Sequence, residues 1–159
     1  MLGFEELRKK VVSGLTEYLG CTVIRGNQAG EMPAFPFLSY NVTTYRTKNS
    51  GTYGVYDDGK QRIPTKQIWS VTVNSNNYSE CARLANKAYD WLENAGTTFL
   101  NDNNVIVESL TNITDRSSIL TYEYFYTQGF DVTFWYLNEV ESGQNTEYID
   151  EMEFDFRNI

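Results

Sequence analysis

The sequence of 159 residues contains no histidine. This absence removes the usual general base at neutral pH, the Ser–His and Cys–His dyads and every histidine metal ligand. Cysteine is almost as scarce, with only Cys21 and Cys81, which stand far apart and form no CxxC pair. In a reducing compartment this usage predicts two free, buried and inert thiols rather than a disulfide or a metal site.

Motifs that hold phosphate or metal are also missing. The chain has no GxxxxGK[ST], no GxGxxG and no EF-hand spacing of acids. The pair Asp57-Asp58 precedes Gly59 and is more typical of a turn than of a cation site. Two carboxylates could still act as acid and base in a cleft, but the sequence offers no way to choose them. We therefore expect no enzyme, no cofactor and no bound metal.

No long hydrophobic run and no excess of basic residues are present. A bilayer span needs about 18 uninterrupted apolar residues, which no window approaches, and Glu5 and Glu6 stand where a signal peptide would be basic. We expect a cytoplasmic site of synthesis and no membrane partner. The net charge of −8 disfavours conventional nucleic-acid binding. It suits a surface past which DNA slides, a mimic of DNA, or simple solubility.

Aromatic residues are plentiful, at 15% of the chain, and indicate many strands or half-exposed subunit contacts. Two helices are expected. The first covers residues 4–19 and ends at Gly20, and the second runs from about Asn76 to about Asn94 and ends at Gly96. Their apolar stripes are Phe4, Leu7, Val11, Leu15 and Leu19 in the first, and Cys81, Leu84, Ala85, Ala88, Trp91, Leu92 and Ala95 in the second.

Strands are predicted over residues 36–47, 67–74, 105–107, 119–126 and 130–137, with a turn at Gln128-Gly129. Residues 48–62 are polar and rich in turn signals, with a hairpin turn at Asp58-Gly59, and predict a long projecting arm. From Glu139 onward the chain is acidic but keeps apolar residues. Such a segment either docks on another subunit or frays into solvent.

Residues 21–42 are the most informative stretch. A short apolar run enters a glycine-bearing loop that leaves through Pro33 and Pro36 directly into a strand. Together with the first helix, the strand at Trp69 to Val73 and the run Gly129-Phe130-Asp131-Val132, this order resembles the small neck-terminator and tail-terminator proteins of tailed bacteriophages and prophages. The resemblance covers nearly the whole chain and is most specific from Arg25 to Tyr40 and at residues 129–132.

The resemblance implies one domain over residues 1–159. Its fold would be α+β, a mainly antiparallel sheet flanked by two main helices, with a long projecting β-hairpin arm. It further implies a hexameric ring that caps the tail tube, ends tube growth and meets the head. The implied partners are further copies of the chain, the tail tube protein and a head–tail connector protein. Genomic DNA would pass through the lumen without specific binding, in a virion assembled in the bacterial cytoplasm.

No individual functional residue follows from the resemblance, because surfaces do the work. From the residues themselves, we expect the arm and the acidic segment to form the subunit interface, through Tyr53, Val55, Tyr56, Arg62, Phe154 and Phe156. An alternative from another class is an acidic DNA mimic that inhibits a host nucleic-acid enzyme. A small hydrolase with a pair of acids and a neighbouring neck connector also stay open.

Overall fold

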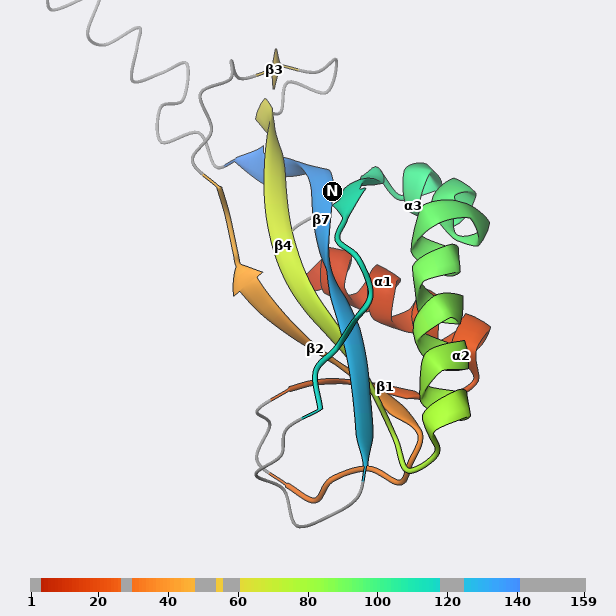
Figure 1. The fold of residues 1–159 in the computed structure, drawn as a ribbon. Coiled ribbons are helices and arrows are strands. Elements are labelled where there is room, and N and C mark those ends of the chain that lie inside the picture. Colours follow the sequence, from red (N-terminus) through yellow and green to blue (C-terminus); the bar gives the residue numbers. More distant parts are fainter. Residues whose placement is uncertain (1–3, 27–29, 48–53, 56–60, 118–124, 141–159) are drawn as a thin grey trace, which may run out of the picture.

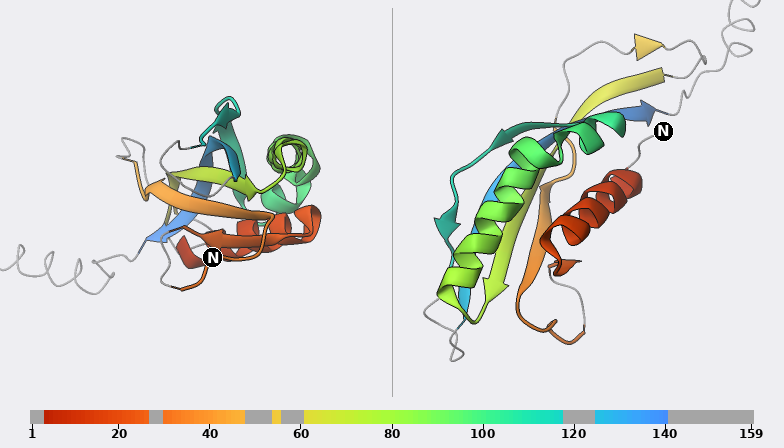
Figure 2. Two further views of the ribbon diagram at one scale, coloured as in Figure 1. Left: turned by 60° about the horizontal axis from the view of Figure 1, so that its bottom comes forward. Right: turned by 90° about the vertical axis from the view of Figure 1, so that its right-hand side faces the viewer.

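A computed structural model describes residues 4–26, 30–47, 54–55, 61–117 and 125–140. Helices pack on one face of a seven-stranded sheet, and in this part of the chain the other face carries no helix (Figures 1 and 2). The expected α+β fold with a mostly antiparallel sheet is confirmed. The elements are α1 (Phe4–Leu19), β1 (Thr22–Arg25), β2 (Phe37–Thr44), β3 (Gly54–Val55), β4 (Gln61–Ser75), α2 (Tyr78–Asp90), η1 (Trp91–Ala95), α3 (Thr97–Asp102), β5 (Val105–Leu110), β6 (Thr114–Asp115) and β7 (Tyr126–Val140).

The first helix, α1, matches its prediction. Its buried residues are Leu7, Val11, Leu15 and Leu19, the i, i+4 spacing that places one apolar stripe on the core. Gly20 takes φ +68, and its N–H donates to the Thr16 carbonyl at 3.0 Å. This left-handed residue ends the helix, as glycine does most readily.

The second helix, α2, is capped by Asn77, whose side chain accepts a hydrogen bond from the Glu80 N–H at 3.0 Å. It continues through η1, a turn of π-helix that ends at Gly96. A π-turn holds more residues per turn than an α-helix, so it shifts the side chains that follow. For this reason Ala95 is exposed rather than part of the buried stripe, and the prediction for it was wrong. The short helix α3 was not predicted.

The sheet has the strand order β1-β2-β4-β7-β5, while β3 pairs with β4 and β6 with β7. Only β1 and β2 are parallel among these pairs. The two long strands β4 and β7 pair over their whole length, from Gln61 opposite Val140 to Ser75 opposite Tyr126. The strand predicted from residue 67 thus begins at Gln61, inside the stretch assigned to the arm.

The turn predicted at Gln128-Gly129 does not exist, because both residues lie within β7. Gly129 stands opposite Thr72, and a Cβ atom there would meet the Val71 carbonyl oxygen at 2.2 Å and the Arg116 side chain at 3.1 Å. Glycine inside a strand often marks such a close approach. Glycine is therefore required at position 129 by packing, and the chain does not reverse there.

The core lies between the helices and the sheet. Trp69 is fully buried, stacks on Tyr40 with ring centroids 4.7 Å apart and meets Phe134 edge-on at 5.2 Å. The predicted inward faces of β4 and β7 are confirmed, since the following residues are buried: Trp69, Val71, Val73, Phe130, Val132, Phe134 and Tyr136. The strand at Val105 is confirmed but only half-buried, because Ile106 is 46% exposed.

Several sequence predictions fall outside the described residues. Of the arm, only Gly54–Val55 and Gln61 onward are described, and Asp58-Gly59 is not. Of the strand predicted over 119–126, only Phe125 and Tyr126 are described, and the acidic segment from residue 141 lies outside altogether. No described helix is long and apolar enough to cross a membrane.

Candidate assembly surfaces

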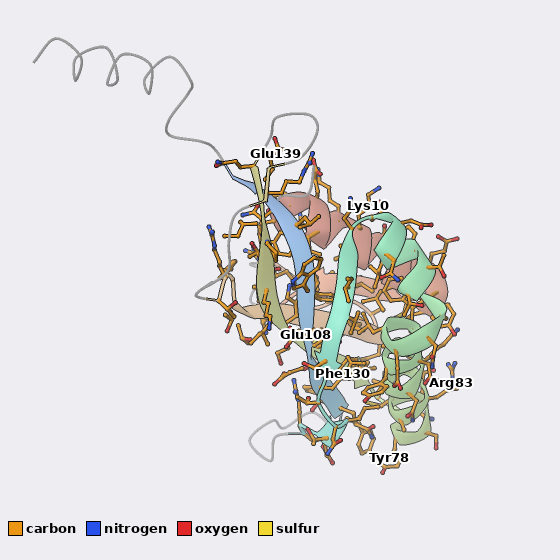
Figure 3. The ribbon with its side chains drawn as sticks, turned by 90° about the horizontal axis from the view of Figure 1, so that it is seen from above. Lys10, Tyr78, Arg83, Glu108, Phe130 and Glu139 are labelled. Atoms are coloured by element: carbon orange, nitrogen blue, oxygen red, sulfur yellow. The ribbon has the colours of Figure 1, made fainter. Side chains whose placement is uncertain are left out.

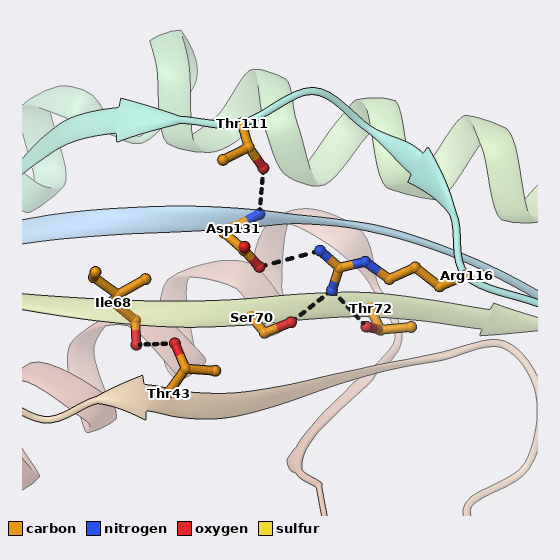
Figure 4. Close-up of polar contacts among 7 residues, drawn as sticks. All are labelled: Thr43, Ile68, Ser70, Thr72, Thr111, Arg116 and Asp131. Carbon is orange, nitrogen blue, oxygen red and sulfur yellow. Dashed lines mark hydrogen bonds and ion pairs between the residues drawn. The ribbon is translucent and has the colours of Figure 1, made fainter.

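The helix-free face of the sheet is polar around Ser70 and Thr72, whereas Ile68 and Trp135 lie on the same face nearer the start of β4. In β4 it carries Ser70 and Thr72, which alternate with the buried Trp69, Val71 and Val73. Figure 4 shows this face, where the Thr43 hydroxyl donates to the Ile68 carbonyl at 3.2 Å and joins β2 to β4. This part of the face is therefore polar and is not a second core.

Arg116 is the centre of this face. Its guanidinium donates to Ser70 Oγ at 2.5 Å and Thr72 Oγ1 at 3.3 Å, and pairs with Asp131 Oδ1 at 3.1 Å (Figure 4). The Asp131 N–H in turn donates to Thr111 Oγ1 at 2.8 Å. Since the charge of Arg116 is already paired, this network fixes the 111–117 segment on the sheet and offers no free anion site.

The sheet has two edge strands, β1 and β5, with which no further described strand pairs. At the β5 edge a groove of about 360 Å³ runs between that strand and the helices, and its apolar lining includes Leu92, Leu100 and Leu110. Its charged lining residues, Glu93 and Glu108, are both acids. Lys66 lies at 2.7 Å from Glu108 and pairs with it.

At the β1 edge a second hollow, of about 390 Å³, lies against the helix-free face. Ile24, Met32, Pro33 and Phe37 contribute its apolar surface, and its charged lining residues are Arg25 and Glu31. The two edges thus differ in chemistry, which a contact between unlike surfaces requires.

Further bases lie beside β1 on the helix side. Arg8 of α1 pairs with Glu5 at 2.6 Å and also bonds the Tyr40 side chain, and both contacts raise the pKa of its guanidinium. The hydrogen bond from Arg8 lowers the pKa of Glu5, and the positive charges of Lys9 and Arg25 lower it further. Arg8, Lys9 and Arg25 are therefore close enough to Glu5 to act on its charge, and they form a basic cluster beside the β1 edge.

The end of the sheet formed by β3 and the first residues of β4 is where the arm was expected. β2 stops opposite Ile68 and β5 starts opposite Tyr136, so beyond these points β4 and β7 extend as a ribbon that β3 joins. Val55 stands opposite Gln61 in this ribbon, next to Arg62. The structure thus places two of the expected interface residues together, whereas Tyr53, Tyr56, Phe154 and Phe156 lie outside the described residues.

The opposite end of the sheet carries aromatic residues that the sequence did not single out. Tyr78 and Tyr126 meet edge-on at 5.5 Å while remaining 58% and 39% exposed, and Phe35 contacts both Phe37 and Phe125 at 5.7 Å. Figure 3 places Tyr78 far from Glu139, which marks the arm end. Only the general abundance of aromatics hinted at these two groups, because their members come from three separate parts of the chain.

The charges are unevenly distributed along the chain. The described residues include twelve acids and ten bases, so this part of the molecule is close to neutral. Residues 141–159 hold six acids and one base, which is five of the eight net negative charges. An acidic surface is therefore not a property of the described sheet and helices.

Reactive chemistry is sparse in the described part of the chain. No group of three or more His, Cys, Asp or Glu residues there could hold a metal ion. Both cysteines are free, Cys81 buried and Cys21 half-buried. Burial raises the pKa of both thiols, so both are poor nucleophiles at neutral pH. The expectation of free thiols is confirmed, and Cys21 is more accessible than expected.

No curated protein matches this chain. A solved structure whose title names no function shares 14% identity at a TM-score of 0.39, over 87% of this chain and 92% of the other. A second, titled "Virion of native gene transfer agent (GTA) particle", shares 12% identity at a TM-score of 0.39, over 84% of this chain and 92% of that one. Both likenesses are too distant to bear on function.

The family comparison is decisive. The sequence model of a family described as "Phage neck terminator protein" matches residues 7–159, which is nearly all of the chain. The match includes α1 from Leu7 onward, the whole sheet and the acidic segment. The chain therefore belongs to the phage neck terminator protein family and has a structural role in the neck of a phage particle.

Proposed function

We propose that the protein assembles as a hexameric ring that caps the phage tail tube, ends tube growth and forms part of the head–tail neck interface. The observation that carries this proposal is the family match over residues 7–159. The whole chain acts as one domain, and its partners are further copies of itself, the tail tube protein and a head–tail connector protein. No catalytic step is part of this role.

The two sheet edges support a ring. A closed ring needs a heterologous contact, in which one patch of a subunit meets a different patch of the next. The β1 edge combines an apolar hollow with bases, while the β5 edge combines an apolar groove with acids. Such unlike surfaces on opposite sides of one sheet suit head-to-tail contacts better than a two-fold dimer.

The arm end supplies a further subunit contact. Val55 and Arg62 lie in the β3–β4 ribbon that extends beyond the rest of the sheet, and Tyr53 and Tyr56 flank it in sequence. In the proposed ring these residues reach the neighbouring copy, together with Phe154 and Phe156 of the acidic segment. Genomic DNA passes through the lumen without specific binding, because a near-neutral body with acidic segments offers phosphates no excess of positive charge.

The test is deletion of the gene from its phage or prophage, with negative-stain electron microscopy of the particles. We expect overlong or ragged tails beside DNA-filled heads without tails, and a return to uniform joined particles when the wild-type gene is supplied in trans. Normal infectious virions from the deletion would overturn the proposal. That outcome would turn attention to the DNA-mimic alternative.

A further inference from the structure

The acidic segment has a two-sided sequence pattern. In residues 151–156 the acids Glu151, Glu153 and Asp155 alternate strictly with Met152, Phe154 and Phe156. In a β-strand successive side chains point to opposite faces, so an extended chain here would present one acidic and one apolar side. This is the pattern of a strand that is added to a sheet edge and buried on one side.

The two faces of the sheet at the β1 edge also differ in chemistry, one being apolar and the other basic. Ile24 faces the helix-free side, where it lines the hollow with Met32 and Phe37. Arg25 is one of the residues that line the hollow, but it stands opposite the buried Tyr40, so its side chain leaves β1 on the helix side. Its charge acts on Glu5 of α1 together with those of Arg8 and Lys9. We propose that residues 151–156 of one copy bind as an added strand along β1 (Thr22–Arg25) of a second copy, with Phe154 and Phe156 over the apolar hollow and the acids toward the Arg8, Lys9 and Arg25 cluster.

Charge decides between the two open edges. At the β1 site Arg8 is paired with Glu5, which leaves the bases Lys9 and Arg25 against the acid Glu31. The charged residues that line the β5 groove are Glu93 and Glu108, and the nearby Lys66 is already paired with Glu108. An acidic strand would be attracted to the β1 edge and repelled by the β5 edge, so we do not expect it to bind in the β5 groove.

The length of the chain favours a second copy over the same one. Through the sheet register, Thr22 to Arg25 lie level with residues 127–130 of β7. Val140 is therefore ten to thirteen residues away along β7 and three strands across, or about 36–45 Å at ordinary strand rise and spacing. Residues 141–151 span at most about 40 Å when fully extended. The same copy could reach its own β1 only with a taut chain, which favours the β1 edge of a second copy.

This inference rests on the proposed ring, because it supplies one of the contacts between its subunits. It is tested by placing the photo-crosslinker p-benzoylphenylalanine at Phe154 in the full-length chain, mixed with an equal amount of isotope-labelled protein. We expect mass spectrometry to find crosslinks from Phe154 to residues 22–37 of the labelled copy. Crosslinks to residues 89–110, or only within one copy, would overturn the inference. The same crosslinker at Tyr148, outside the alternating run, is the matched control and should give a severalfold lower yield at β1.

Charge reversal provides the second arm of the test. Lys9→Glu with Arg25→Glu should reduce the β1 crosslink at least tenfold, and Glu151→Lys, Glu153→Lys and Asp155→Lys on the mixed partner should restore it. Glu93→Lys at the β5 groove is the control and should leave the yield unchanged. Circular dichroism melting checks that each variant folds. Unchanged crosslinking after the reversal at Lys9 and Arg25 would also overturn the inference.

Tail length in the micrographs separates this inference from the proposed function. Uniform tails made with the Lys9→Glu, Arg25→Glu protein, together with wild-type crosslinks outside β1, would overturn the strand contact and leave the terminator role intact. A β1 crosslink in a protein whose deletion leaves virions normal would support the strand contact and overturn the terminator role.

Discussion

Trp91 shows how single residues join the helices of this fold. Its indole ring is buried between Gly14 of α1 and Gly96 at the end of η1. A Cβ atom at Gly14 would come within 2.4 Å of Trp91 Cζ2, and one at Gly96 within 2.3 Å of Trp91 Cε2. With a glycine on each side of it, the ring has little room to move, and both positions are restricted to glycine by packing rather than by the backbone.

Gly14→Ala is therefore expected to destabilise the protein although alanine favours helices. Overpacking a core costs about 1–3 kcal/mol, against a gain of about 1 kcal/mol from helix propensity. Urea unfolding followed by Trp fluorescence measures the balance. Ser13→Ala, at an exposed neighbouring position of the same helix, is the control and should be neutral or slightly stabilising. Gly14→Ala as stable as that control would show that Trp91 moves aside freely.

The thiols predict a pH dependence. Burial raises the pKa of Cys81, whose Sγ donates to the Val73 carbonyl at 3.4 Å. As the pH rises, the Cys81 thiol loses its proton in the unfolded chain before it does so in the folded protein. The stability that the buried, protonated thiol contributes is therefore fully present below the pKa of the unfolded chain and is lost as the pH rises through and above about 8.5–9. We expect the unfolding free energy of the wild type to fall more steeply between pH 8 and 10 than that of Cys81→Ala. Parallel pH profiles would contradict this account.

At the scale of elements, the long strand β7 depends on a residue that local pattern misreads. A Cβ atom at Gly129 would collide with the Val71 carbonyl and the Arg116 side chain, so Gly129→Ala should force β4 and β7 apart. We expect a loss of about 1–3 kcal/mol or somewhat more in urea unfolding. Thr133→Ala, on the same face of the same strand, is the matched control and should cost much less. An equal cost for both would mean that the sheet absorbs the extra methyl group.

This strand also shows what sequence could and could not predict. The alternation of Phe130, Val132 and Phe134 and the helical spacing of α1 are local, so their buried faces were predictable from the chain alone. The roles of Gly129 and Ala95 depend on contacts with Val71 and on the π-turn η1, which no local pattern encodes. The candidate assembly surfaces were predictable only in part. The basic cluster beside β1 combines residues of α1 and of a strand, and the aromatic contacts at the opposite end of the sheet combine residues from three distant segments.

The arm is the element whose role is most directly testable. Since β4 starts at Gln61 and pairs with Val140, replacing residues 49–58 with glycine and serine of equal length leaves that pairing in place. We expect an unchanged melting temperature but loss of assembly on tail-tube ends in negative stain. The same replacement over residues 118–124 is the control and should assemble normally. Full assembly without the arm residues would remove Tyr53, Val55 and Tyr56 from the interface.

At the scale of the whole molecule, the separation of charge matters more than its total. A near-neutral body linked to an acidic segment can assemble without the mutual repulsion that a net charge of −8 spread over the surface would cause. In the proposed strand contact, each acidic segment would find its countercharges on a neighbouring copy, which would tie solubility of the single chain to assembly.

Salt provides the test at this scale. In the amide variant, five acids of the acidic segment are replaced, so the net charge changes from −8 to −3 and no described residue is altered. The replacements are Glu147→Gln, Asp150→Asn, Glu151→Gln, Glu153→Gln and Asp155→Asn, and this protein is called the neutral variant. Screening shortens from about 10 Å at 0.1 M to about 3 Å at 1 M salt. Assembly of the wild type, measured by sedimentation velocity, should therefore weaken over this range. The neutral variant should assemble more weakly at low salt and lose most of the salt dependence, because the attraction to Arg8, Lys9 and Arg25 is gone. Equal salt dependence of the two proteins would place the electrostatic contact between subunits elsewhere in the molecule.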